Sequence, residues 1–312
     1  MTEAGLIAAR FLHFTTVMAV FGLALFPLYT YPSRDGKPPA RLTHWLRRML
    51  RLSALLALLS GIAWAYLTVA NMTGSLTDAA KPDALLSVLR DTAFGQIWIA
   101  RVALIVALLV SVRGCKRSDH PDWITAGTSG VILAALAGVG HTHVSDGAAH
   151  VIHISADGAH LLAAGAWLGG LLPLAYLLAL ARRSPSPEHC GDASIALLRF
   201  SGMGYTAVVA LVASGLINSW FLVGSVSALT GSPYGQLLLA KLCLFAGMLA
   251  LAALNRFWLV PSLMKAMVPV ESAVLFARLR RHVLGEQTLG LIIVFIVSVL
   301  GMTQPTIGWS SR

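Results

Sequence analysis

The chain has 312 residues, of which 57% are hydrophobic and only 12% are charged. With a mean hydropathy of +0.75, this composition excludes an ordinary soluble or disordered protein and is typical of a polytopic membrane protein. The formal net charge of +10 does not indicate a nucleic-acid partner, because the basic residues cluster at the ends of apolar segments and act there as topology signals. The three cysteines form no Cys-x-x-Cys pair, which predicts reduced thiols rather than a disulfide framework or a zinc-thiolate site. They are Cys115, Cys190 and Cys243.

Eight segments are apolar over about the 20 residues that a helix needs to cross roughly 30 Å of hydrocarbon. They lie near 5–30, 45–72, 95–113, 122–141, 154–181, 194–226, 235–264 and 282–303. A backbone in lipid must satisfy its own hydrogen bonds, and helices do so within each segment. The sequence therefore predicts an all-α, polytopic helix bundle with about eight transmembrane helices in a lipid bilayer.

Basic residues follow every second apolar segment. They are Arg34, Lys37, Arg41, Arg47 and Arg48 after the first, Arg113, Lys116 and Arg117 after the third, Arg182 and Arg183 after the fifth, and Lys265, Arg278, Arg280 and Arg281 after the seventh. Because cytoplasmic loops carry the excess of Lys and Arg, we expect both termini and the segment from His141 to His160 to face outside, which is the periplasm for a bacterial inner membrane. A short surface helix is predicted to start at Pro82.

Three short patterns occur twice along the chain, in the same order. Leu12-His13 corresponds to Ala159-His160, Ser60-Gly61-Ile62 to Ser214-Gly215-Leu216, and Phe94-Gly95-Gln96 to Tyr234-Gly235-Gln236. This order predicts two four-helix halves in the same orientation, 1–145 and 146–312, within a single membrane domain. Chance similarity between apolar helices is the alternative explanation.

A cluster of histidines lies between the fourth and fifth apolar segments. Its members are His141, His143, His150, His153 and His160. If a helix begins near Ala148, then His150, His153, Asp157 and His160 share one face, because residues three, four and seven apart align on a helix. Imidazole binds transition metals, so the cluster predicts a metal site at the membrane surface. For any single member, a polar anchor at the interface is the alternative.

His13 and His160 differ from the other histidines because each lies about two turns inside its segment, where a polar side chain needs a partner. A packed, hydrogen-bonded histidine and a metal ligand or relay both fit. Met72 and Met302 fall near the outer ends of their segments, where a thioether could bind Cu(I). Methionine is also ordinary filler in apolar cores.

Arg101, Lys241 and Glu286 are charged residues that lie within apolar segments. We expect Arg101 and Lys241 to extend to the lipid headgroups, because their long side chains can do so at modest cost. Glu286 follows a basic group, and an ion pair with one of those residues is the expected arrangement, with a proton or metal relay as the alternative. The basic group is Arg278, Arg280 and Arg281.

Several motifs stand out along the chain. They are Gly140-His141, His160-Leu161-Leu162-Ala163-Ala164 and Trp167-Leu168-Gly169-Gly170-Leu171-Leu172-Pro173-Leu174, together with the last segment from Arg281 to Glu286 and on to Leu300-Gly301 and Pro305. These motifs resemble the copper resistance protein D family. The resemblance implies an inner-membrane protein that brings copper from the periplasm to the cytoplasm, alongside a separate small periplasmic copper carrier. His141 and His160 match the family's pattern, and we expect His13 to match it too. His143, His150 and His153 fall outside the resemblance, so it implies no role for them.

The leading interpretation is a copper-binding permease that contributes to copper homeostasis and resistance and is not an enzyme. Outer histidines would capture the ion, and His13 and His160 would pass it inward, with Met72 or Met302 as a further candidate. No nucleotide-binding loop such as Gly-x-x-x-x-Gly-Lys-Ser/Thr occurs, which disfavours ATP-driven pumping. One alternative is an electron-transfer protein with b-type haem held by His13 and His160. Another is a docking or sensing component that binds copper without moving it. Zinc suits the same ligands.

Overall fold

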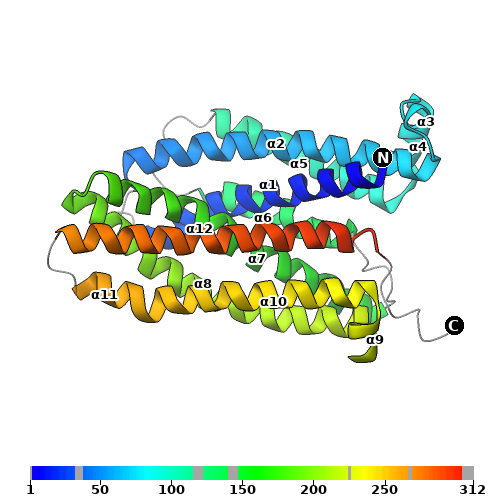
Figure 1. The fold of residues 1–312 in the computed structure, drawn as a ribbon. Helices are drawn as coiled ribbons and strands as arrows, with labels where there is room; N and C mark the ends of the chain where they lie inside the picture. The colour runs from blue at the N-terminus through cyan, green and yellow to red at the C-terminus, as the bar shows by residue number, and fades with distance from the viewer. Residues whose placement is uncertain are drawn as a thin grey trace.

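The computed structural model describes residues 2–31, 38–114, 122–139, 147–223, 226–265 and 269–303. Helices fill almost all of these ranges (Figure 1), so the predicted all-α bundle is confirmed. Their bounds are α1 Thr2–Thr30, α2 Ala40–Thr73, α3 Leu76–Ala79, α4 Pro82–Asp91, α5 Ala93–Gly114, α6 Trp123–Ala134, η1 Ala135–Val139, α7 Gly147–Arg183, α8 Pro187–Val223, α9 Val226–Gly231, α10 Pro233–Leu254, η3 Asn255–Leu259, α11 Val260–Lys265 and α12 Pro269–Leu300.

The described chain has 7 helices that are long and apolar enough to cross a membrane, and α6 with η1 forms a shorter apolar one. The 12 residues of α6 and the 5 residues of η1 together rise about 28 Å, close to the thickness of the hydrocarbon layer. The start of α1 and the end of α12 lie at the same end of the bundle, as an even number of crossings requires (Figure 1). Helix α12 begins at Pro269, well before the predicted apolar segment, because its basic first half continues the helix beyond the apolar part.

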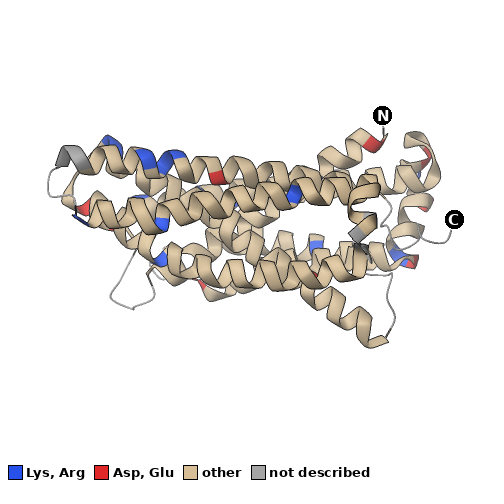
Figure 2. Cartoon of the chain, turned by 60° about the horizontal axis from the view of Figure 1, so that its bottom comes forward, with Lys and Arg blue, Asp and Glu red and all other residues tan. Residues whose placement is uncertain are grey.

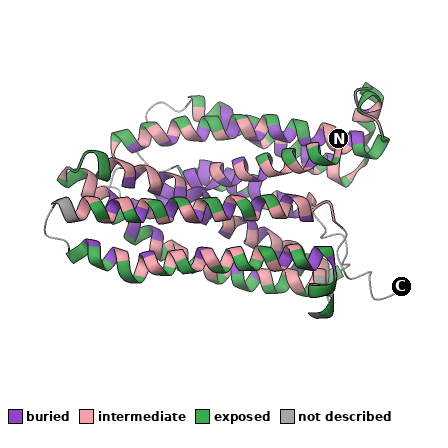
Figure 3. Ribbon diagram, in the orientation of Figure 1, coloured by how far each residue is buried: buried purple, intermediate pink, exposed green. Residues whose placement is uncertain are grey.

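Helices α1 and α7 form the centre of the bundle. Helix α1 packs on α2, α6, α7 and α12, and α7 packs on α8 and α12 as well. The two helices approach closely where glycines meet, since a Cβ added at Gly169 would lie 2.7 Å from the Gly22 Cα and 2.4 Å from the Met18 carbonyl oxygen. Small residues permit such close contact between membrane helices. Buried residues gather in the middle of the bundle, and exposed ones occupy outward faces (Figure 3).

The outward faces carry large apolar side chains, such as Trp220 and Val110, which suits contact with lipid. Most of the Lys and Arg residues lie toward the end of the bundle opposite the N-terminus (Figure 2). The chain therefore has the exterior of a multi-pass membrane protein, with its positive charge concentrated at one end.

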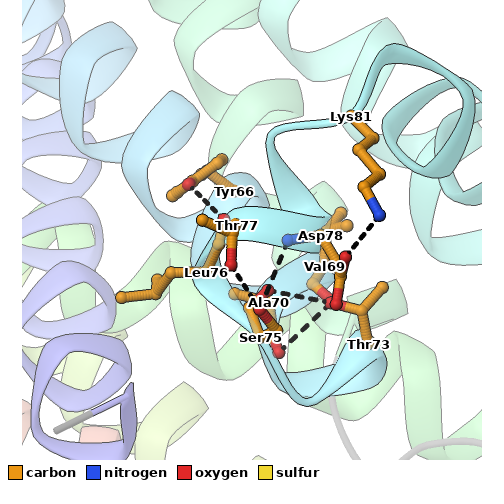
Figure 4. A network of polar contacts seen from close by, with 9 residues as sticks. All are labelled: Tyr66, Val69, Ala70, Thr73, Ser75, Leu76, Thr77, Asp78 and Lys81. Carbon is orange, nitrogen blue, oxygen red and sulfur yellow. Dashed lines mark hydrogen bonds and ion pairs between the residues drawn. The ribbon is translucent and has the colours of Figure 1, made fainter.

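Short helices α3 and α4 form a polar cap at the end that carries the N-terminus (Figure 4). The Ser75 hydroxyl accepts a hydrogen bond from the Asp78 backbone N–H and caps α3, and Lys81 Nζ lies 2.6 Å from the Asp78 carboxylate. The hydrogen bond and charge of Lys81 lower the pKa of Asp78 below its ordinary value. The helix predicted to start at Pro82 is confirmed as α4.

Candidate functional site

His13 on α1 lies in a closed pocket and is only 1% exposed. Its Nδ1 is 3.0 Å from the Ala57 carbonyl oxygen and 3.2 Å from Ser60 Oγ, both on α2. Its Nε2 is 2.8 Å from Arg101 Nη2 on α5. A carbonyl only accepts and a guanidinium only donates, so Nδ1 carries the hydrogen and Nε2 accepts from Arg101. Both ring nitrogens are thus occupied, which leaves no lone pair for a metal and does not support a haem ligand.

Arg101 is 2% exposed and remains inside the bundle. The expectation that it extends to the headgroups is wrong, because the interior offers it acceptors. Besides His13, the guanidinium donates to the Ile132 carbonyl oxygen on α6 and lies 5.2 Å from the centre of the Trp98 ring. A buried cation with hydrogen-bonding partners is tolerated where an unpaired one is not.

His160 on α7 contacts a serine through Nδ1, as His13 does, but its other ring nitrogen has no hydrogen-bond partner among the described residues. Its Nδ1 is 3.0 Å from Ser214 Oγ on α8, and the Ser214 hydroxyl donates its hydrogen to the Ala210 carbonyl oxygen. Ser214 therefore accepts from His160, so that Nδ1 carries the hydrogen and Nε2 keeps its lone pair. Within the described ranges no residue hydrogen-bonds to that Nε2. Lys241 on α10 interacts with His160 electrostatically.

The open nitrogen belongs to a side chain that lines a cavity of about 200 Å³. His153 and Asp157 line the same cavity, as their shared helix face predicts. Asn218 Nδ2 donates to Asp157 Oδ1 at 3.2 Å, and the His153 ring stacks on Phe221 with centroids 4.8 Å apart. The other polar or charged side chains of the lining are Arg10, Ser219, Tyr234 and Lys241. Arg10 is not among the site residues predicted from the sequence. Its Nη1 donates to the Gly301 carbonyl oxygen at 3.1 Å.

The remaining predicted site residues are spread out. His150 is half-buried in the first turn of α7 and is outside the cavity lining. Met72 is an exposed residue at the end of α2, and Met302 is partly buried just after α12. His141 and His143 lie outside the described residues. Over the described part of the chain, no three His, Cys, Asp or Glu side chains are close enough together to hold a metal ion.

A second cavity, of about 550 Å³, shares His160 and Lys241 with the first. It is lined mainly by apolar side chains and includes Trp167, two turns further along α7, together with Met248 on α10 and Gly290 on α12. The two cavities therefore lie next to each other around His160 and Lys241, and the second one includes residues further along α7.

Glu286 on α12 lies beyond Trp167 and is 2% exposed. Trp167 Nε1 donates to its Oε2 at 3.2 Å, and Asn255 Nδ2 donates to its Oε1 at 2.8 Å. The ion pair expected between Glu286 and the basic residues of α12 is wrong, because neutral donors from α7 and η3 reach the carboxyl group instead. Sequence reasoning missed Asn255, although an Asn within an apolar segment is a signal for a buried hydrogen bond.

An apolar bundle of membrane-spanning helices, with histidine, acidic and basic side chains around internal cavities, defines a polytopic membrane protein with a polar interior. Residues 1–151 match the family model described as copper resistance protein D-like, N-terminal domain, and residues 194–300 match copper resistance protein D. The chain belongs to the copper resistance protein D family.

Relatives of similar length support this assignment. The chain is 32% identical over 302 residues to inner membrane protein YebZ of Escherichia coli strain K12, covering 96% of this chain and 98% of YebZ. It is 33% identical over 302 residues to copper resistance protein D of Pseudomonas syringae pv. tomato, covering 96% of both. Copper transport protein CutJ of Bacillus subtilis strain 168 is 32% identical over 257 residues, covering 80% of this chain and 46% of CutJ. No solved structure matches.

Proposed function

We propose that this protein moves copper from the periplasm to the cytoplasm across a bacterial inner membrane and so contributes to copper homeostasis and resistance, without acting as an enzyme. The single observation that carries the proposal is the His160 side chain, whose Nε2 has no hydrogen-bond partner among the described residues and which lines a cavity between transmembrane helices. A neutral imidazole with a free lone pair is a good ligand for copper. The names of two relatives refer to copper resistance and copper transport.

The orientation follows from charge. Because Lys and Arg gather at one end of the bundle, that end is cytoplasmic in our proposal, and both termini are periplasmic (Figure 2). The cavity around His160 is lined by residues near the start of α1 and the end of α12, such as Arg10 and Leu300. It would therefore receive copper from the periplasmic side, where a separate small copper carrier would deliver it.

In this scheme the outer ligands capture copper and His160 passes it inward. The outer ligands are His141, His143, His150 and His153. Met72 or Met302 would join His160, with Asp157 beside it, in passing the ion inward. Because these groups are not gathered into one preformed metal site in the described ranges, copper would be bound transiently as cargo rather than as a resident cofactor. His13 would join the path only after Arg101 leaves its Nε2, so we assign it a supporting role.

Copper accumulation in cells tests the proposal. Cells expressing the wild-type protein should accumulate more copper than cells without it, and His160→Ala should abolish the increase at a matched amount of protein in the membrane. His44→Ala, which removes an exposed histidine on α2, is the matched control and should leave accumulation unchanged. Zinc is measured in the same samples, since imidazole binds both metals. Undiminished accumulation with His160→Ala would overturn the proposal.

A further inference from the structure

Glu286 is a buried carboxyl group that has no charged partner among the described residues. It is held by one indole N–H and one amide N–H, and no charged side chain within the described ranges adds an electrostatic interaction. The one charged residue of η3, Arg256, is directed away and donates through Nε to the Tyr205 hydroxyl. An unpaired carboxylate is costly to bury in a membrane protein, so the protonated form of such a group is accessible.

A histidine is linked to this carboxyl group through Asn255. His282 Nδ1 is 2.8 Å from Asn255 Oδ1, and Asn255 Nδ2 is 2.8 Å from Glu286 Oε1. The amide oxygen only accepts, so His282 donates from Nδ1 to Asn255, which in turn donates to Glu286. Trp167 donates to the same carboxyl group. Every hydrogen in the network points toward Glu286, which is the arrangement for an ionised carboxylate.

Protonation of Glu286 requires the opposite arrangement. The new O–H needs an acceptor, and the Trp167 indole is a donor only. If the Asn255 side chain turns over, its oxygen faces the carboxyl group and its NH₂ faces His282, whose Nδ1 must then be bare. Glu286 takes one proton from water to form its O–H bond. Neutral His282 loses hydrogen from Nδ1 and gains one at Nε2 by exchange with water, so that one proton is taken up overall.

The backbone around Asn255 is unusual as well. Residues Asn255–Leu259 form a π-helical turn between α10 and α11. Such turns are rare and occur often at functional sites. Here the turn begins at the residue whose side chain joins the carboxyl group to the histidine, and that side chain is only 9% exposed.

We propose that Glu286 is a proton-binding site whose occupancy is coupled to His282 through reorientation of the Asn255 amide. Trp167 borders both this site and the cavity that contains His160, which places the proton site next to the route proposed for copper. Only that last connection rests on the proposed function. The proton site itself can be tested in the absence of copper.

Infrared spectroscopy of the purified full-length protein, titrated with acid and base, follows the C=O band of the protonated carboxyl group. We expect a titrating band that is absent in Glu286→Gln and still present in Asp157→Asn, the matched carboxyl control. His282→Ala should shift the midpoint by about one pH unit, the size expected for coupled sites. In Asn255→Leu the same His282→Ala change should have no effect, because the link is broken.

Two results would overturn the proposal. One is a carboxyl spectrum that is the same with and without Glu286, and the other is a midpoint that does not respond to His282→Ala. If Asn255→Leu does not fold, Trp167→Phe provides the second probe, because removing one of the two donors must shift the midpoint if the carboxyl group titrates in this pocket. Since no copper is present, failure here is independent of the copper accumulation measured in cells.

Discussion

The two histidine pockets are built alike and differ in whether a ring nitrogen is open. In each pocket a serine on the next long helix contacts the histidine Nδ1, and a glycine follows that serine. Each also has a cation on the third long helix. The planar guanidinium of Arg101 donates hydrogen bonds to both His13 Nε2 and the Ile132 carbonyl oxygen. The ammonium group of Lys241 instead interacts with Asp157, and it makes no hydrogen bond to His160 Nε2. The same arrangement of residues thus produces one histidine with both ring nitrogens hydrogen-bonded and one histidine with a single hydrogen-bonded nitrogen among the described residues.

The likeness extends to the starts of helices α5 and α10. Thr92 Oγ1 accepts from the Gly95 N–H at 3.0 Å, and Ser232 Oγ accepts from the Gly235 N–H at 3.0 Å. The repeated pattern supports our proposal that 1–145 and 146–312 are two halves of one duplicated membrane domain. Gly22 follows His13 by nine residues, and Gly169 follows His160 by nine residues. The two glycines contact each other where α1 packs on α7, and we call this contact the seam.

The largest effect is expected at this seam. Gly169→Ala would place a Cβ against the backbone of Met18 and Gly22, and neither can move without shifting α1. Overpacking of this kind costs about 3 kcal/mol of unfolding free energy or more. Thermal unfolding in detergent should show a large loss of stability, or no folded protein. Gly202→Ala is the control, because nothing lies within 4 Å of a Cβ added there. Equal stability of the two variants would mean that the seam is not tightly packed.

Removing the cation of each pocket should affect the stability of the protein to different extents. Arg101→Ala leaves the His13 Nε2 and the Ile132 carbonyl oxygen without their donor, and should lower the unfolding free energy by about 2 to 3 kcal/mol. Lys241→Ala should cost less than Arg101→Ala, because no hydrogen bond to His160 is lost and Asp157, which loses the charge of Lys241, keeps the hydrogen bond from Asn218 Nδ2. Chemical denaturation of both variants measures the difference. If Lys241→Ala is the more harmful change, the assignment of closed and open pockets is wrong.

Exchange of the cation type sharpens the comparison further. Lys241→Arg introduces into the second pocket a planar guanidinium like that of Arg101. This group should donate a hydrogen bond to His160 Nε2. We expect the affinity for copper to fall about tenfold, equivalent to about 1.4 kcal/mol, and copper accumulation to fall with it, with little change in unfolding temperature. Unchanged accumulation would show that an open Nε2 is not required.

The smallest effect concerns an exposed ion pair, in contrast to the buried cations. Lys81 lowers the folded-state pKa of Asp78, so the pair stabilises the cap above the unfolded pKa of about 4, and this contribution is lost as the pH falls through the folded-state pKa. Hydrogen exchange of the α3 and α4 amides in wild type and Lys81→Ala should differ slightly near neutral pH and converge in acid. A difference that persists in acid would exclude the ion pair as its cause.

The sequence was sufficient for the membrane helices and for one side of the cavity. Continuous apolar segments define the crossings, and helical periodicity places His153, Asp157 and His160 on one face. The sequence was insufficient to predict the partners of Arg101 and Glu286. The partner of a buried charge depends on which helices pack together, and the sequence of a single helix does not specify its neighbours. Arg101 finds acceptors on α1 and α6, and Glu286 finds donors on α7 and η3.

The central claim is that the open nitrogen of His160 carries copper. The most direct test measures Cu(I) uptake into proteoliposomes that contain the purified wild-type protein or His160→Gln, which keeps a polar side chain near Ser214 but removes the imidazole ligand. We predict rapid uptake by the wild type and loss of nearly all of it in the variant, at equal stability and equal protein content. Uptake by His160→Gln at the wild-type rate would contradict the account.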